Sequence, residues 1–175
     1  MTLALRRPRP EEAEELARLH IQCWREAYEG IVPKVVLENA SLEARIATWR
    51  RHIADEERIV LAAYDGEKPV GFILAGPPRE EVFEGADGQV AAFYILASHQ
   101  RMGLGKRLLR EAARGWKALG GKSLGLGVLA ENAKARAFYE KMGGKLAKTG
   151  TWSWDGHPLA DAIYIFHDLD ALGKH

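Results

Sequence analysis

Apolar residues follow helical spacing in the first third of the chain. They recur every three or four positions after Pro10 and predict a helix that ends near Tyr28, with a buried face formed by Leu16, Leu19, Cys23 and Ala27. Ser41, a residue type that caps helix N-termini, begins a second predicted helix, whose buried stripe comprises Leu42, Ile46, Trp49 and Ile53. A short strand at residues 2–6 precedes both helices. Residues 28–39 between them are expected to form a loop or a short helix.

The middle of the chain has the composition and spacing of strands. Runs at residues 59–64 and 70–76 flank a short glycine-containing loop and predict a hairpin, which a polar, acidic loop at residues 79–88 follows. In residues 89–97 both alternating sets are largely apolar, which is typical of a central strand covered on both faces.

The next helix has apolar residues at Leu104, Leu108, Leu109, Ala112 and Leu119, and a strand at residues 124–129 follows it. This order predicts a parallel strand pair across a helical connection. A further helix from near Asn132 to Gly143 and a closing hairpin at residues 151–154 and 162–167 complete the chain.

Composition and charge narrow the class of protein. The 175 residues, 47% hydrophobic and 28% charged, suit one globular domain that covers residues 1–175. A net charge of +1 lacks the basic field of duplex-binding proteins, which disfavours a nucleic-acid partner. No apolar run approaches the ~20 residues that span a membrane, and no signal-peptide core follows the N-terminus, so we expect no membrane partner and a cytoplasmic location.

Cysteine and histidine usage offers little for metal or disulfide chemistry. The single cysteine, Cys23, excludes an intramolecular disulfide and lies on the apolar face of its helix, which favours a packed thiol over a nucleophile. The six histidines show no metal-ligand spacing, so the sequence predicts no metal site.

The most informative stretch lies between the central strand and the helix after it. It consists of Gln100, Arg101, Met102, Gly103, Leu104, Gly105 and Lys106. Glycines without a Cβ let the backbone take unusual conformations and let a ligand approach closely, and the first N–H groups of the new helix face outward at its positive end. A strand, a glycine turn and a helix start together predict a site for a phosphate or pyrophosphate. The alternative interpretation is a tight connection only, because Gly-x-Gly is common where a strand leads into a helix. The stretch lacks the lysine of a P-loop and the third glycine of a dinucleotide-binding loop.

A second candidate stretch opens the helix near Asn132. Asn132, Ala135 and Tyr139 share one helix face, and seven residues at ~1.5 Å each place Tyr139 about 10 Å beyond Asn132 along the axis. Phe138 and Met142 lie on a different face as core contacts. The alternative interpretation is an N-cap asparagine and a half-buried tyrosine.

Both stretches together resemble the GNAT superfamily of N-acetyltransferases. The first resembles its Gln/Arg-x-x-Gly-x-Gly/Ala motif, and the second its Asn-x-x-Ala-x-x-Leu/Phe-Tyr-x-x-x-Gly pattern. The order of predicted strands and helices also resembles that superfamily over nearly the whole chain. The resemblance implies an α/β fold of the α+β type: a twisted mixed sheet of about six or seven strands, splayed between the fourth and fifth, with about four flanking helices.

The resemblance also implies a co-substrate and residue roles. The turn from Gln100 to Lys106 would hold the pyrophosphate of acetyl-CoA, and the main chain of Ile95 and Ala97 would pair with its pantetheine arm. Asn132 would bond the pantetheine, Ala135 would leave room for it, and Tyr139 would protonate the departing thiolate. The acetyl group would pass to an amine acceptor by direct attack in a ternary complex.

The general base and the acceptor stay open at this stage. Many relatives carry a glutamate near the start of the fourth strand, whereas this chain has Gln89, which cannot accept a proton. The candidate bases are Glu26, His20, Glu84 and Asp87. The alternatives are an acyl-CoA-binding sensor without catalysis and an enzyme that acetylates protein N-termini or lysines. A homodimer is also open, because GNAT relatives are often dimers.

Overall fold

The computed structural model describes residues 3–38, 41–78, 85–154 and 156–172 of the chain. Its contacts divide the protein into two compact units. The first comprises Met1–Leu74 with Ala92–Ala112, and the second comprises Ala75–Ala91 with Ala113–His175. Part of the predicted loop at residues 79–88 lies outside the described residues. Glu84, one of the candidate bases, belongs to that part.

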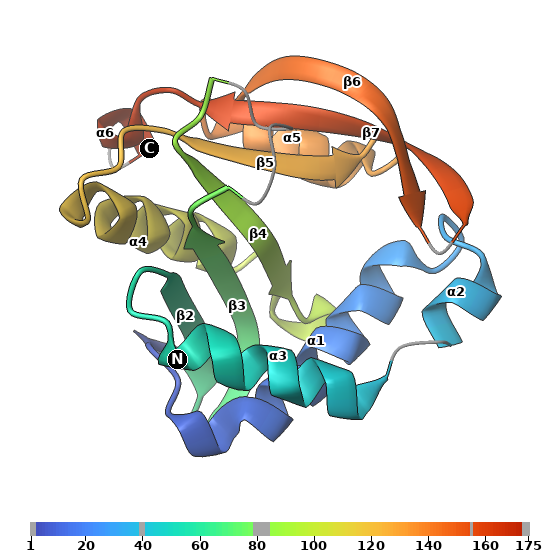
Figure 1. Cartoon of the computed structure of the whole chain (residues 1–175), viewed down its shortest axis with the longest axis vertical. Coiled ribbons are helices and arrows are strands. Elements are labelled where there is room, and N and C mark those ends of the chain that lie inside the picture. Colours follow the sequence, from blue (N-terminus) through green and yellow to red (C-terminus); the bar gives the residue numbers. More distant parts are fainter. Residues whose placement is uncertain (1–2, 39–40, 79–84, 155, 173–175) are drawn as a thin grey trace. The chain divides into compact units, whose positions relative to one another are not determined.

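The elements follow the predicted order along the chain (Figure 1). The first unit contains β1 (Ala4–Arg6), the short 3₁₀ helix η1 (Pro10–Glu12), α1 (Ala13–Tyr28), α2 (Lys34–Glu38), α3 (Leu42–Ala54), β2 (Ile59–Asp65) and the 3₁₀ helix η3 (Ala97–His99). The second contains β5 (Leu124–Leu129), α5 (Ala133–Lys141), β6 (Lys145–Trp154), β7 (His157–Phe166) and α6 (Leu169–Leu172). The unit boundary runs through β3 (Lys68–Gly76), β4 (Gly88–Ile95) and α4 (Leu104–Ala118).

The strands form one mixed seven-stranded sheet in the order β1-β2-β3-β4-β5-β7-β6. β1 pairs antiparallel with β2, and β7 pairs antiparallel with both β5 and β6. β4 pairs parallel with β5, with Gly88 opposite Leu124 and Gln89 opposite Gly125. This confirms the predicted mixed sheet and its parallel pair, while the predicted splay between these two strands stays a prediction.

Helices α1 and α3 pack against each other in the first unit, as their apolar stripes require (Figure 1). The Ser41 hydroxyl accepts a hydrogen bond from the Ala44 N–H at 3.3 Å, so the predicted cap is present. Trp49 and Ile53 are buried as expected, whereas Leu42 and Ile46 are only half-buried. The sequence pattern missed His52, which is buried beside Trp49.

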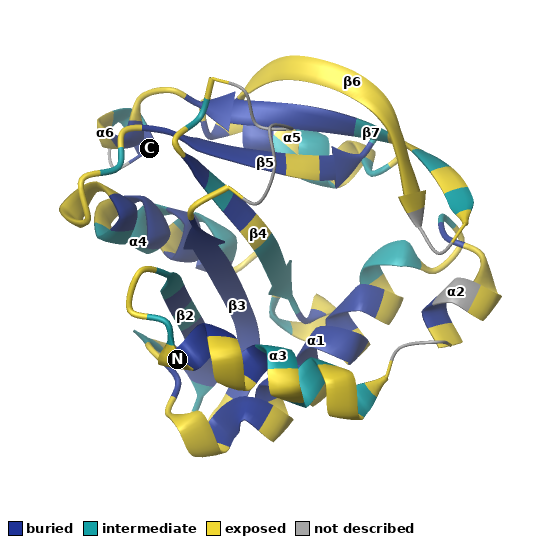
Figure 2. Cartoon of the chain, in the orientation of Figure 1, coloured by how far each residue is buried: buried dark blue, intermediate teal, exposed yellow. Residues whose placement is uncertain are grey.

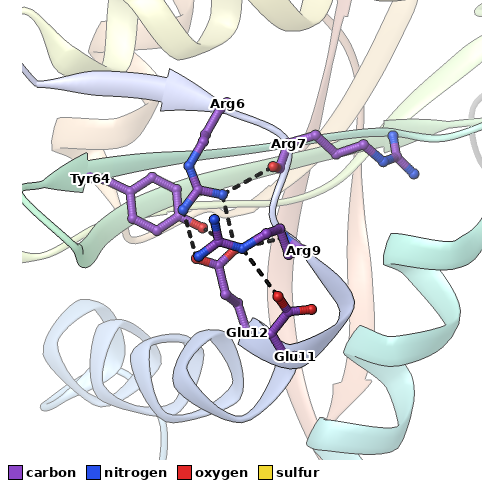
Figure 3. Close-up of polar contacts among 6 residues, drawn as sticks. All are labelled: Arg6, Arg7, Arg9, Glu11, Glu12 and Tyr64. Atoms are coloured by element: carbon purple, nitrogen blue, oxygen red, sulfur yellow. Dashed lines mark hydrogen bonds and ion pairs between the residues drawn. The ribbon is translucent and has the colours of Figure 1, made fainter.

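An ion-pair cluster fixes the start of α1 to the first strands (Figure 3). The Glu12 carboxylate accepts two hydrogen bonds from the Arg6 guanidinium, at 2.6 and 2.9 Å, and one from the Tyr64 hydroxyl at 3.2 Å. The Arg9 N–H donates to it at 2.6 Å. These bonds, led by those from Arg6, outweigh the effect of burial and lower the pKa of Glu12 from 4.5 to about 2.

Two further predictions of burial were wrong. Leu119 is 54% exposed, because α4 ends at Ala118 and Gly120 turns the chain with φ +98°. β4 is also not covered on both faces: Ala91 is exposed and residues 92–95 are half-buried (Figure 2). Alternating apolar residues show that both faces tolerate burial, but they cannot tell whether the protein or a ligand provides the cover.

The second unit builds its core around β5 and β7. Tyr164 and Phe166 of β7 are fully buried, whereas Trp152 of β6 is 49% exposed. The predicted closing hairpin is present, but both of its strands are longer than expected, because β6 already starts at Lys145 and β7 at His157. Over the described residues, the structure contains no helix with the length and apolar character of a membrane span.

Candidate active site

The end of β4 and the turn after it carry the first set of candidate residues. β4 ends at Ile95, η3 begins at Ala97, and α4 begins at Leu104. Leu104 is buried and anchors the helix start, whereas Gln100, Arg101, Met102 and Gly103 are exposed. The predicted strand–turn–helix order is therefore confirmed, except that Ala97 lies in the 3₁₀ helix and not in the strand.

The backbone of the turn takes left-handed conformations at two positions. Gly103 has φ +78°, as a glycine at a tight turn permits, and Arg101 has φ +63°, which side-chain-bearing residues rarely adopt. Gly105 lies in the first turn of α4 and does not need a positive φ. The expectation of an unusual backbone at both glycines therefore holds only for Gly103, because Gly105 is already helical.

The N-terminus of α4 has the electrostatics of an anion site. The helical ladder begins with the bond from the Arg107 N–H to the Gly103 carbonyl at 3.2 Å, so the N–H groups of residues 104–106 precede it. The first turn holds Lys106 and no acidic residue. By contrast, Glu14 and Glu15 occupy the first turn of α1, where carboxylates stabilise the positive helix end. The first turn of α4 contains no such carboxylate.

Side chains form hydrogen bonds with the main-chain groups that are expected to pair with the pantetheine arm. The Gln100 amide donates to the Ile95 carbonyl at 2.9 Å. The Ala97 N–H donates to the Glu26 carboxylate at 3.1 Å. The Ala97 N–H can therefore take an external partner only after an exchange of hydrogen bonds, whereas the Ile95 carbonyl keeps a second lone pair for one.

The second set of candidate residues lies on α5, in the other unit. Asn132 is the N-cap of α5, and its Oδ1 accepts the Ala135 N–H at 3.2 Å. Tyr139 is 9% exposed, and its ring lies near those of Tyr164 and Phe166, with centroids 6.2 and 6.5 Å away. Phe138, predicted as a core contact, is half-buried, while Met142 is buried as predicted.

These contacts bear on the two interpretations of the α5 residues. The N-cap geometry of Asn132 agrees with the structural interpretation, and Tyr139 is more buried than that interpretation expected. Neither contact tests binding or proton transfer, so the functional roles of Asn132, Ala135 and Tyr139 stay predictions.

Asp87 is a structural acceptor in the second unit. Its carboxylate accepts hydrogen bonds from the Trp116 indole at 2.9 Å and from the N–H groups of Lys122 at 2.7 Å and Ser123 at 3.1 Å. Burial opposes ionisation, but these bonds outweigh it and hold the pKa of Asp87 below its ordinary value. A carboxylate that is held in this way is a poor proton acceptor.

His20 is also a weak base. It is 8% exposed, and burial, with the nearby charges of Arg45 and His52, lowers the pKa of its ring to about 3. Its Nδ1 lies 3.3 Å from the Trp49 indole Nε1, and its Nε2 lies 3.3 Å from Arg45 Nη1. The ring therefore stays neutral at physiological pH.

Glu26 differs from the other described candidates. It lies near the C-terminal end of α1, where the helix dipole disfavours a carboxylate, and its side chain is exposed. Its carboxylate accepts a hydrogen bond from the main-chain N–H of Ala97, at the start of η3. Among the candidate bases that the structure describes, Glu26 is thus the one whose exposed side chain lies at the turn after β4.

Cys23 is packed as predicted. It is 2% exposed, and burial, together with the charge of Glu26, raises the pKa of its thiol to about 12. The thiolate that nucleophilic catalysis needs is scarce at such a pKa.

The sequence analysis missed a group of rings around His20. The Tyr28 and Tyr94 hydroxyls hydrogen-bond at 2.8 Å, and the His20 ring lies 4.9 Å from Phe72 and 5.5 Å from Tyr94, centroid to centroid. Burial raises the pKa of Tyr28, although its bond to Tyr94 opposes this. A signal was present: His20, Trp24 and Tyr28 recur every four residues and form a second stripe on α1.

Comparison with known proteins matches this chain to one family. Residues 13–144 match the model of the acetyltransferase (GNAT) family. A protein of Bacillus subtilis (strain 168) described as "Uncharacterized N-acetyltransferase YuaI" is 28% identical over 171 residues, which cover 97% of this chain and 96% of that protein. The "Probable N-acetyltransferase Rv2775" of Mycobacterium tuberculosis is 26% identical over 162 residues, which cover 86% of this chain and 84% of that protein.

Solved structures share the fold at low sequence identity. The PaiA N-acetyltransferase of Thermoplasma acidophilum, in complex with coenzyme A, has a TM-score of 0.72 at 22% identity and covers 93% of this chain and 98% of its own. The yncA protein of Salmonella typhimurium, with its cofactor acetyl-CoA, has a TM-score of 0.73 at 15% identity and covers 95% and 94%.

Proposed function

Because the chain belongs to the GNAT family of acetyltransferases, we propose that it transfers the acetyl group of acetyl-CoA to a primary amine of a small molecule or peptide. The observation that carries this proposal is the start of α4. Its first turn holds Lys106, no acidic residue, and N–H groups that precede the helical ladder. Such a helix end stabilises a pyrophosphate, which acetyl-CoA supplies.

The proposal assigns the turn from Gln100 to Lys106 to the pyrophosphate. The Ile95 carbonyl pairs with the pantetheine arm through its second lone pair, and the Ala97 N–H pairs with it once the Glu26 side chain releases it. Asn132 uses its Oδ1 as a helix cap, so its amide N–H groups donate to a pantetheine carbonyl. Ala135, one turn further along α5, leaves room for the arm.

The reaction proceeds by direct attack in this proposal. The amine nitrogen attacks the thioester carbonyl carbon and forms the C–N bond, and the C–S bond then breaks. The Tyr139 phenol gives its proton to the departing thiolate, and the amine proton passes to a base. The buried thiol of Cys23 argues against an acetyl-cysteine intermediate.

We assign the base role to Glu26. Asp87 is held by three N–H donors and His20 has a low pKa, so both are weak proton acceptors. Release from the Ala97 N–H when acetyl-CoA binds frees the Glu26 carboxylate for the amine proton, directly or through water. Gln89 then needs no part in proton transfer.

Calorimetric titration with acetyl-CoA, coenzyme A and ATP tests the co-substrate. We expect acetyl-CoA to bind with a Kd on the order of micromolar, which corresponds to a binding free energy of about −8 kcal/mol. We expect ATP to bind far more weakly. Preferential binding of ATP would contradict the proposal. Tight acetyl-CoA binding without turnover on any amine, peptide or protein would favour a sensor. The homodimer, the single domain and the cytoplasmic location stay predictions.

A further inference from the structure

Arg45 is a half-buried cation for which the described residues provide no acidic partner. Its guanidinium lies 3.3 Å from His20 Nε2 and over the ring of Trp24, with 5.8 Å between the guanidinium carbon and the ring centroid. In the part of the chain that the structure describes, no carboxylate lies within ion-pair distance of Arg45, and the hydroxyl-bearing Tyr94 is the group that favours its charge. Burial lowers the pKa of Arg45, so its surroundings disfavour a charge that they do not balance.

The hydrogen-bonding needs of Trp49 determine the tautomer of His20. Trp49 is 1% exposed, and its indole N–H has His20 Nδ1 as its acceptor at 3.3 Å. An indole nitrogen can only donate, so Nδ1 must keep its lone pair. A neutral imidazole then carries its proton on Nε2.

This tautomer places two donors side by side. The His20 Nε2–H and the Arg45 Nη1–H lie with their nitrogens 3.3 Å apart, and neither can accept from the other. An oxygen anion beside both groups would accept from each and would also balance the Arg45 charge. Water can accept as well, but it leaves the charge uncompensated.

We propose that the His20 Nε2–H and the Arg45 guanidinium form an anion subsite that binds a carboxylate on the acceptor amine. This inference rests on the proposed function and specifies its substrate class: an amino acid or peptide whose amine and carboxylate lie well apart. His20 and Glu26 are six residues apart on α1, which is about 9 Å along the helix axis. The amine end lies toward Glu26 and Ala97, and the carboxylate end lies toward Arg45.

The acceptor panel pairs amino acids with their carboxamides. It contains linear ω-amino acids of increasing length, from β-alanine to aminohexanoate, and the matching ω-amino amides. Thiol release gives kcat and KM for each member. Arg45→Gln removes the cation, and Arg50→Gln is the matched control, because Arg50 is an exposed arginine on the same helix.

We expect the wild-type protein to prefer longer acids over their amides by at least tenfold in kcat/KM, mainly through KM. Arg45→Gln should reduce that ratio at least tenfold and leave the amides nearly unchanged, whereas Arg50→Gln should leave the ratio intact. The ratio between variants cancels differences in amine pKa between acids and amides. A ratio within twofold of wild type in a folded Arg45→Gln protein overturns the subsite.

A binding experiment separates this inference from the proposed function. Glutarate is titrated into ¹⁵N-labelled protein, and the His20 ring nitrogens are followed by NMR. We expect a neutral ring with its proton on Nε2 and a saturable shift that Arg45→Gln abolishes. An Nδ1–H tautomer, or an equal shift in Arg45→Gln, overturns the subsite whether or not an amine is acetylated. Saturable glutarate binding without turnover on the panel keeps the subsite and contradicts the transferase proposal.

Discussion

Replacing Glu12 with glutamine tests the ion-pair cluster at the start of α1. The variant removes the carboxylate that Arg6, Arg9 and Tyr64 share in the structure (Figure 3). The pKa of Glu12 falls from 4.5 to about 2 on folding, and about 1.4 kcal/mol per pKa unit makes this worth about 3 kcal/mol. The Arg6 side chain is 37% exposed, so water screens the pair. We therefore expect a loss of about 2 kcal/mol at neutral pH.

The pH dependence gives this prediction its sign. A carboxylate whose pKa is lower in the folded protein stabilises the fold fully above its unfolded pKa of 4.5, and the stabilisation disappears as the pH falls from 4.5 to about 2. Urea unfolding of both proteins should thus show a difference of about 2 kcal/mol at neutral pH that shrinks toward zero near the lower limit.

Glu14→Gln is the matched control for Glu12→Gln. Glu14 pairs with Arg18 at 2.9 Å, but both side chains are more than half exposed, at 58% and 63%. We expect this variant to change the free energy of unfolding by less than about 0.5 kcal/mol. The reasoning is refuted if Glu12→Gln matches that control at neutral pH, or if its effect is the same across the acid range.

Three further variants test the proposed site. Tyr139→Phe should lower kcat on the order of 10²-fold with little change in acetyl-CoA Kd, and a kcat within twofold of wild type would remove the acid role. Glu26→Gln should likewise lower kcat on the order of 10²-fold, measured by thiol release at saturating acetyl-CoA, and an unchanged kcat would reject it as the base. Gly105→Val should fold, as circular dichroism can check, and weaken acetyl-CoA binding at least about tenfold in calorimetry; unchanged affinity would make the turn purely structural.

Local signals in the sequence predicted most of the elements. The Ser41 cap, the apolar stripe of α1 and the glycine-containing β2–β3 loop each act over a few residues, so the chain specifies them without its tertiary context. The parallel β4–β5 pair followed from the helical connection between them. Short elements such as α2 and α6 carry too few residues for a periodic signal, and α2 was expected only as one of two options.

The parts of the site that escaped prediction depend on contacts between distant residues. Glu26 and Ala97 are 71 positions apart, and His20 and Arg45 are 25 apart, so no local pattern connects them. A local pattern can also mislead. Leu119 fitted the helical periodicity, but the helix ends one residue earlier and its side chain is exposed. Gly103, by contrast, could be identified from the sequence, because its positive φ is a conformation that favours glycine.

The most direct test of the central claim measures both products of one reaction. The protein is incubated with acetyl-CoA and the amine panel, free thiol is followed by a colour reagent, and the acetylated amine is identified by mass spectrometry. The account predicts one acetylated amine for each thiol released, with at least one panel member turned over far faster than acetyl-CoA is hydrolysed. Thiol release without acetylated amine, or no release in the presence of a protein that binds acetyl-CoA, would contradict the account.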